Sequence, residues 1–217
     1  MKIKEEYENK IFTNYQGCKF KVIKYKNANN VLIEFQDEYK CKKNTFLEMI
    51  KKGQIKNPYY PSVYGAGYIG DERIKTREKV GNGKYNGKHT KEYEAWRSIL
   101  QRCYDKKYLL RRPTYKGCMV CKEWLCFSNF YNWVIKEPNY EKWKIGNRWA
   151  VDKDIIVKGN KIYSPDTCCL VPNYINIVFT KKKCKKEKEE IIQLAEQEYK
   201  KKNISEKCYI AMKNKVE

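Results

Sequence analysis

Apolar side chains recur every three or four residues between Thr90 and Tyr104, at Tyr93, Trp96, Ile99, Leu100 and Cys103. This spacing places them on one face of a helix, and Thr90 is a suitable N-cap. Residues 124–134 repeat the pattern through Trp124, Phe127, Phe130, Tyr131 and Val134. The two stretches therefore predict two amphipathic helices in the middle of the chain.

A different pattern occupies the first part of the chain. Residues 19–24 and 30–35 are rich in β-branched and aromatic types, and the stretch 27–30 between them has the composition of a turn. These features predict a β-hairpin. Apolar positions within residues 45–52, followed by Gly53, predict a short helix with a glycine at its C-terminal end.

The remaining segments complete the outline. Residues 149–157 predict a strand, Gly159-Asn160 a turn, and residues 161–163 with 168–171 its partner strand, before a helix over 173–179. Residues 57–70 predict an irregular connector. Residues 71–90 are polar and rich in Gly and Lys, which predicts either a flexible linker or a strand of basic contacts. The tail predicts one highly charged helix with a weak apolar stripe at Ile191, Ile192, Ala195 and Tyr199.

Charge adds a functional expectation. The 217 residues include 47 Lys+Arg and 26 Asp+Glu, a net charge of +21. An AT-rich genome enriches lysine, but such drift raises Asp and Glu together with it, and here they lag far behind. A positive potential of this size attracts polyanions. We expect a nucleic-acid partner, most of all double-stranded DNA.

The apolar runs of the chain indicate its location, and the location in turn bears on the role of its ten cysteines. No run reaches the roughly 18 apolar residues of a membrane span, and the N-terminus lacks the apolar core of a signal peptide. We therefore expect a cytoplasmic protein without membrane contact. In that compartment metal ligation is a better expectation for some cysteines than a disulfide framework.

Five separated motifs carry a family resemblance. They are W-R-S-I-L-Q-R-C-Y (96–104), P-T-Y-K-G-C-M-V-C-K-E-W-L-C-F-S-N-F (113–130), V-D-K-D-I (151–155), G-N-K-I-Y-S-P (159–165) and C-C-L-V-P-N-Y-I-N (168–176). Together they resemble the phage HNH-type (ββα-metal) homing endonucleases that carry an Apetala-type DNA-binding module. The N-terminal unit and the tail from Lys186 resemble the same proteins, but the three-stranded Apetala-type sheet is missing. A phage or prophage origin follows as an expectation.

The resemblance completes the expected fold, an α+β chain. A small β-rich N-terminal unit covers residues 1–64, and a basic linker covers 65–95. A helix-flanked ββα core follows over 96–180, and a charged helical tail over 181–217.

The resemblance also implies a site for Mg²⁺ or Mn²⁺. Asp152 takes the place of the strand ligand and Asn176 that of the helix ligand, with Asp154 as an alternative carboxylate. Lys153 stands where the family has its general-base histidine, and Thr167 where a central Asn orients the loop. A lysine with a pKa of about 10.4 is a poor base at neutral pH. The single histidine, His89, lies far from the motif in an expected exposed loop, which excludes a histidine-dependent nuclease.

Zinc is a second expectation. Cys118 and Cys121 have the two-residue spacing of a zinc knuckle. Cys103 and Cys168 complete the expected set, with Cys126 and Cys169 as alternatives. About one zinc per chain would supply folding energy to a small core. The alternative is that these thiols are small buried hydrophobes. We expect Cys18, Cys41, Cys184 and Cys208 to be unrelated to the site, as plain core or surface thiols.

Basic and aromatic residues interleave in the same region. Lys and Arg neutralise phosphates, and Tyr hydroxyls donate to phosphate oxygens, although some of these side chains belong to solvated helix faces. Arg111 and Arg112, expected in a loop beside the metal site, are the favoured pair. The expected nucleic-acid contacts are Arg97, Arg102, Arg111, Arg112, Tyr115, Lys116, Arg148, Lys158, Lys161 and Tyr163.

Three functions remain open from the sequence. The first is an HNH-like DNA endonuclease of homing type that cuts or nicks with a divalent metal. The second is a non-enzymatic DNA-binding protein descended from that family, acting in phage regulation or counter-defence. The third is a module that binds RNA or ribonucleoprotein.

Overall fold

A computed structural model describes residues 2–79, 85–180 and 188–215. The chain is mixed α+β, as expected. It forms two compact units, Met1–Pro61 and Ser62–Glu217, so the first boundary lies close to the expected residue 64. Each unit has a hydrophobic core of its own, and each is described separately below.

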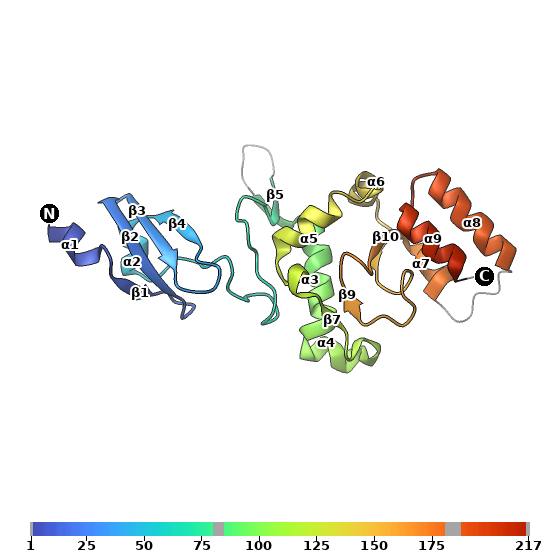
Figure 1. The fold of residues 1–217 in the computed structure, drawn as a ribbon, viewed down its shortest axis with the longest axis horizontal. Coiled ribbons are helices and arrows are strands. Elements are labelled where there is room, and N and C mark those ends of the chain that lie inside the picture. Colours follow the sequence, from blue (N-terminus) through green and yellow to red (C-terminus); the bar gives the residue numbers. More distant parts are fainter. Residues whose placement is uncertain (1, 80–84, 181–187, 216–217) are drawn as a thin grey trace. The chain divides into compact units, whose positions relative to one another are not determined.

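The first unit is built on a four-stranded antiparallel sheet in the order β1-β2-β3-β4 (Figure 1). The strands are β1 (Ile11–Thr13), β2 (Lys19–Asn27), β3 (Asn30–Phe35) and β4 (Lys42–Thr45). The β2–β3 pairing confirms the predicted hairpin. Two short helices, α1 (Lys2–Tyr7) and α2 (Leu47–Lys51), complete the unit, and Gly53 follows α2 with a φ of 63°.

Alternation along the strands decides which face of this sheet is buried. Phe20 and Val22 of β2 point to the same side as Ile33 and Phe35 of β3, and all four are fully buried. Leu47 and Ile50 of α2 pack into the same cluster. Successive side chains of a strand point to opposite faces, so the alternate residues of these strands form the other face.

The second unit begins with a segment that was expected to be a linker. Ile69 and Ile74 of the expected linker, together with Val63 and Tyr64 just before it, pack against the main core. Backbone hydrogen bonds tie Tyr68 to Leu125 and Phe127 at 2.9 and 2.8 Å. A Cβ on Gly67 would collide with the Leu100 side chain, so this close approach to the following helix requires glycine. Most of the expected linker therefore belongs to the second unit.

Next come a two-stranded hairpin, β5 (Arg77–Lys79) and β6 (Tyr85–His89), and helix α3 (Lys91–Tyr104). The predictions for α3 are confirmed, because the Thr90 hydroxyl accepts from the Tyr93 N–H and the predicted apolar face is buried. The second predicted helix is shorter than expected. One turn, η3 (Lys122–Leu125), precedes α5 (Phe127–Val134), since Cys126 between them has extended backbone.

Around these elements lie α4 (Lys106–Arg111), η2 (Pro113–Tyr115), β7 (Met119–Val120) and α6 (Tyr140–Ile145). Three tryptophans, Trp96, Trp124 and Trp143, are almost completely buried in the core that these elements share. This core carries the wall of the site described below.

The predicted strand–strand–helix succession is present, with one change of partner. Strand β8 (Trp149–Asp152) pairs with β10 (Cys169–Pro172), and α7 (Asn173–Thr180) follows directly. In contrast, β9 (Ile162–Tyr163) pairs in parallel with β7 and not with β8, so the prediction for residues 161–163 was wrong. The predicted strand 149–157 also ends early, because a turn begins at Asp152.

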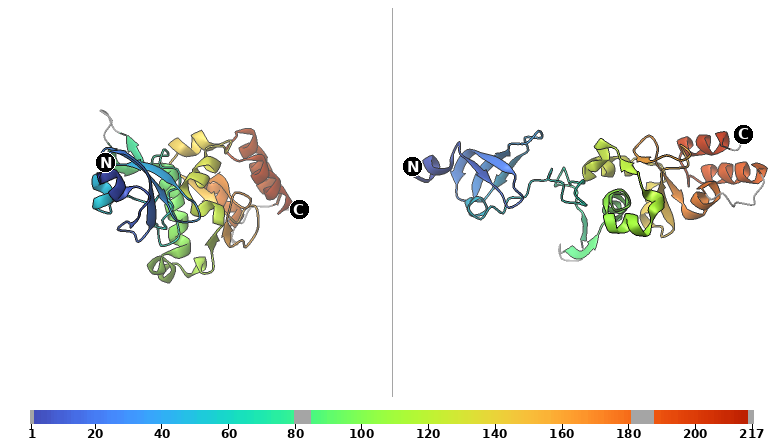
Figure 2. Two further views of the ribbon diagram at one scale, coloured as in Figure 1. Left: turned by 60° about the vertical axis from the view of Figure 1, so that its left-hand side comes forward. Right: turned by 90° about the horizontal axis from the view of Figure 1, so that it is seen from below.

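Two helices, not one, form the described part of the tail. They are α8 (Lys188–Lys200) and α9 (Glu206–Asn214), and they lie side by side (Figures 1 and 2). Between them Lys202 has a φ of 53°, and the Ser205 side chain caps α9. Lys181–Lys186 and Cys184 lie outside the described residues.

The tail helices share a core with the strand–strand–helix element. Ala195 is the only residue of the predicted stripe that is fully buried there. The core consists of Ile155, Cys169, Val171, Ile175, Ala195, Ile204, Cys208 and Met212. Within the described ranges, no helix combines the length and the apolar character needed to cross a membrane.

Candidate functional site

A cleft of about 530 Å³ opens in the second unit. Residues of α3, of β8 and of the turn after β8 form most of its lining, and α6, α7, η2 and β9 contribute the rest. It is lined by Lys91, Glu94, Ala95, Ser98, Ile99, Arg102, Tyr115, Trp143, Trp149, Ala150, Val151, Asp152, Lys153, Asp154, Tyr163, Asn173 and Asn176. All four residues of the predicted catalytic set are among them.

Asp152 is the last residue of β8, and its carboxylate shapes the turn that follows. Oδ1 accepts hydrogen bonds from the backbone N–H groups of Asp154 and Ile155, at 2.8 and 2.7 Å. Oδ2 has no hydrogen-bond partner among the described residues. Burial raises the pKa of Asp152, and the two backbone hydrogen bonds oppose that effect. One carboxylate oxygen thus fixes the turn and leaves the other for a ligand.

Lys153 is buried and fully engaged. Its Nζ donates to both carboxylate oxygens of Asp154 at 2.8 Å and to the Asn160 carbonyl at 2.6 Å. An ammonium has three N–H donors and no acceptor. Its three donors are therefore matched by three acceptors, and this lysine is held as a structural cation beside the site.

Asn160 ties the loop after β8 together. Its side-chain amide donates to the carbonyls of Lys153 and Ile162 at 3.0 and 2.6 Å, and its Oδ1 accepts from the Ile162 N–H. Thr167, expected to orient this loop, donates to the Ile162 carbonyl and is hydrogen-bonded to Ser164. Sequence reasoning missed the role of Asn160, although it had placed that residue in the Gly159-Asn160 turn.

Asn176 reaches the same cleft from α7, a helix that contacts both β8 and β10. The helix begins directly after β10, whose last residue, Pro172, pairs with Trp149 at the start of β8. The first turn of α7 therefore lies beside the start of β8. Asn173 lines the cleft as well.

Glu94 is a second residue that the sequence did not single out. It lines the cleft from α3, one turn after Lys91, together with Asp152. Its carboxylate forms no hydrogen bond or ion pair with the described residues. From the sequence alone, the position of Glu94 relative to the buried apolar residues of α3 indicates that its side chain points away from the core, but not that it lines a cleft.

Three predicted nucleic-acid contacts lie in the cleft. Arg102 donates a hydrogen bond to the buried Tyr163 hydroxyl and lies 5.7 Å from the centre of the Tyr115 ring. Burial raises the pKa of Tyr163, and Arg102 opposes this rise. Arg102 and Tyr163 are therefore part of the wall, while the half-buried Tyr115 lies at its end.

The other seven predicted contacts lie outside the cleft lining and are exposed. Arg111 ends α4 and Arg112 follows it, so the favoured pair does not border the candidate metal ligands. Arg97 packs over the Tyr64 ring, and the Lys161 Nζ donates to the Thr114 carbonyl. The exposed set is Arg97, Arg111, Arg112, Lys116, Arg148, Lys158 and Lys161.

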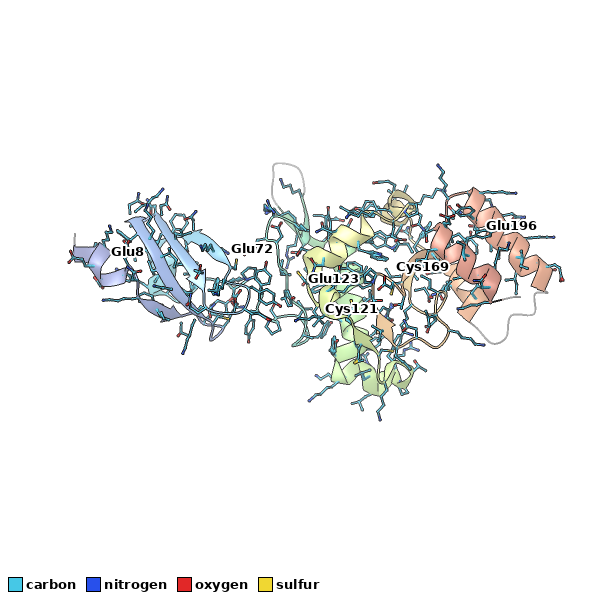
Figure 3. The ribbon with its side chains drawn as sticks, viewed as in Figure 1. Glu8, Glu72, Cys121, Glu123, Cys169 and Glu196 are labelled. Atoms are coloured by element: carbon cyan, nitrogen blue, oxygen red, sulfur yellow. The ribbon has the colours of Figure 1, made fainter. Side chains whose placement is uncertain are left out.

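The cysteines expected to bind zinc are not assembled into one group. In the described part of the chain, no three His, Cys, Asp or Glu side chains lie close enough together to hold a metal ion. Burial raises the pKa of Cys103 and Cys168 to about 12, which opposes the thiolate that zinc requires. Cys121 lies between β7 and η3, whereas the alternative ligand Cys169 begins β10 (Figure 3). Zinc therefore stays a prediction.

His89 lies in a strand and not in the exposed loop that was expected. It ends β6, its Nδ1 lies 3.1 Å from the Thr76 carbonyl, and its ring packs 4.6 Å from the Tyr93 ring. It does not line the cleft that contains Asp152.

The cleft differs in charge from the chain as a whole. Its lining holds three cations, Lys91, Arg102 and Lys153, and three carboxylates, Glu94, Asp152 and Asp154. The chain has an excess of 21 positive charges. Comparisons of this chain with protein-family models, with curated proteins and with solved structures find no match.

Proposed function

We propose that this protein is an HNH-like DNA endonuclease that binds duplex DNA at the cleft of its second unit and cuts one strand with a divalent ion. One observation carries the proposal. Asp152, at the end of the first strand of a strand–strand–helix element, and Asn176, on the helix, line the same cleft. This is the pairing of ligands that the family resemblance implies.

The donors of the cleft suit a hard cation. Asp152 Oδ2 and the Asn176 side chain offer oxygen, and Mg²⁺ typically takes one or two protein ligands while keeping several waters and phosphate oxygens. Bound there, the ion would polarise the scissile phosphate and stabilise the leaving oxygen. The charge of the cleft agrees with this, because carboxylates repel a phosphate unless a cation lies between them.

The remaining residues have separate tasks. Lys153 neutralises Asp154 and, with Asn160, fixes the turn that presents Asp152. Glu94, which lines the same cleft, accepts the proton of the attacking water, a role that a carboxylate can fill in place of imidazole. The exposed Arg148 and Lys158 contact the flanking phosphates.

Nicking of supercoiled plasmid in Mg²⁺ or Mn²⁺ tests this proposal. The wild type is expected to nick, and EDTA is expected to stop it. Asp152→Ala should abolish nicking and leave DNA affinity nearly unchanged, since one lost carboxylate removes no phosphate contact. Glu94→Gln should slow nicking without weakening binding. Asp166→Ala, an exposed carboxylate outside the cleft, is the matched control and should nick like the wild type.

Equal nicking by Asp152→Ala and the wild type would refute this placement of the site. A wild type that binds DNA but nicks with neither metal would support a second function, DNA binding without hydrolysis. The engagement of Lys153 favours that second function, because the place of the catalytic base is then filled by a cation whose donors are all used.

A further inference from the structure

The four-stranded sheet of the first unit has one face that no described element of that unit covers. Its inner face packs on α2 and contains the cluster around Phe20 and Phe35. Its outer face consists of the alternate residues of the same strands. On that face Lys19, Lys24 and Lys42 are exposed, and Lys21 is half-buried.

The register brings these lysines together. Lys21 of β2 lies opposite Glu34 of β3, and Glu34 lies opposite Lys42 of β4. Lys42 and Glu34 form an ion pair of 3.4 Å. Lys19 and Lys24 lie on the same strand as Lys21, so Glu34 is the single carboxylate among the paired residues of these four described strands on that face. We call Lys19, Lys21, Lys24 and Lys42 the basic sheet face.

We propose that the basic sheet face is a second binding surface for the phosphate backbone of duplex DNA. The inference rests on the proposed DNA binding of the second unit and extends it, because one chain then holds one duplex at two places. Two linked contacts raise the apparent affinity well above that of either alone, provided that both can engage together.

Composition favours a duplex backbone over a single strand. Proteins that bind single strands stack bases on aromatic rings. In the described strands, no aromatic side chain belongs to the paired positions of the basic sheet face, whereas Phe20 and Phe35 point inward.

The test compares two triple variants of the full chain. Lys19→Gln/Lys21→Gln/Lys24→Gln removes three charges from the basic sheet face. Lys51→Gln/Lys52→Gln/Lys56→Gln removes three exposed charges from α2 and the residues after it, on the other side of the same sheet. Both have the same net charge and alter the same unit. Binding to a duplex of about 30 base pairs is measured in EDTA from 50 to 300 mM salt.

The face variant should lower the slope of log K against log salt by about 2–3, at about 0.9 per lost phosphate contact. The control variant should change it by less than 1. Equal losses in the two variants would overturn the proposal, since net charge alone would then account for them. An unchanged slope in the face variant would overturn it as well, provided that its thermal unfolding matches that of the wild type. If it does not, Lys19→Arg/Lys21→Arg/Lys24→Arg, which keeps the charge, must bind like the wild type.

Two further arms distinguish the basic sheet face from the cleft and from a membrane-binding surface. Plasmid nicking at low salt and saturating protein depends on the cleft, so the face variant should nick like the wild type there. Asp152→Ala should lose nicking, while the slope of its log K for duplex against log salt stays unchanged. A failure of the cleft proposal can therefore be distinguished from a failure of the basic-sheet-face proposal. If the face lysines are needed to bind vesicles of anionic lipid but not duplex, the occupant is a membrane surface and the proposal is wrong.

Discussion

At the end of β8, the Asp152 carboxylate lies where burial opposes its charge and raises its pKa. Compared with the unfolded chain, the folded state binds the proton of Asp152 more tightly. Ionisation of Asp152 therefore lowers the free energy of unfolding as the pH rises through the folded pKa. This penalty is absent below the unfolded value of about 3.9. This destabilisation is consistent with a functional role for the Asp152 carboxylate, which here is the proposed binding of a metal ion.

Asp152→Asn is expected to raise the melting temperature at pH 7.5. The amide keeps the Oδ1 acceptor for the Asp154 and Ile155 N–H groups and removes the buried charge. Each kcal/mol gained corresponds to about 2–4 °C in a protein of this size. Calorimetry at pH 7.5 and pH 4.5 should show a gain that shrinks at the lower pH. A lower melting temperature at pH 7.5 would mean that the charge serves the turn and not a ligand.

Glu92 is the second residue whose charge affects stability, and it joins two helices that line the cleft. Its side chain is 1% exposed, and its Oε1 accepts hydrogen bonds from the Tyr140 hydroxyl and the Lys144 ammonium of α6. Burial by itself raises the pKa of Glu92, but these hydrogen bonds lower it below the ordinary value. The contact links α3 to α6, which both line the cleft.

Glu92→Gln should cost about 1–3 kcal/mol of unfolding free energy at pH 7, because a buried donor pair loses its charged acceptor. A lowered pKa gives stability that is present above the unfolded value of about 4.3 and lost as the pH falls through the folded value. Urea unfolding should therefore show the difference from the wild type at pH 7 and a smaller one at pH 4. Glu141→Gln, exposed on α6, is the control and should change little. Equal stability of Glu92→Gln and the wild type would contradict this role of Glu92.

Among the elements, the tail helices differ most from the prediction, because they pack against the strand–strand–helix element. Helices α8 and α9 and the residues between them bury Ile204, Cys208 and Met212 against Ile155, which directly follows the turn of Asp152 and Asp154. The Lys215 ammonium also donates to the Asp154 carbonyl. The tail thus supports the turn that presents the proposed metal ligand.

Met212→Ala should destabilise the second unit by about 2–5 kcal/mol, because it leaves a cavity at a fully buried position. Ile210→Ala, on the same helix but 49% exposed, should cost far less. Denaturant unfolding followed by tryptophan fluorescence measures this, since all five tryptophans lie in the second unit. Similar costs for the two variants would show that α9 does not pack on this core.

For the whole molecule, charge gives the broadest expectation. The first unit has 13 lysines and seven Asp+Glu, so both units share in the excess of 21 positive charges. Duplex affinity should fall steeply with salt, by about 10³-fold or more between 50 and 200 mM if six or more phosphates are contacted. Fluorescence anisotropy checks this. An affinity that is flat across the range, or absent at low salt, would exclude phosphate contacts as the basis of binding.

The sequence by itself determined the features that depend on neighbouring residues. The hairpin of β2 and β3, the capped helix α3 and the start of α7 at Asn173 follow from local alternation, helical spacing and turn composition. Such patterns report interactions within about four residues along a helix or between adjacent strands. The family resemblance, and not a local pattern, implied a shared site for Asp152 and Asn176, and both line one cleft.

Only the tertiary structure decided which distant segments meet. The sequence cannot show that β9 pairs with β7, that Glu94 and Asp152 line the same cleft, or that Lys153 donates to Asp154 and Asn160. Nor could a weak apolar stripe show that the tail completes the core behind the site. These outcomes depend on contacts between residues far apart in the chain, where the same hydrophobic pattern is compatible with several partners and packing selects one.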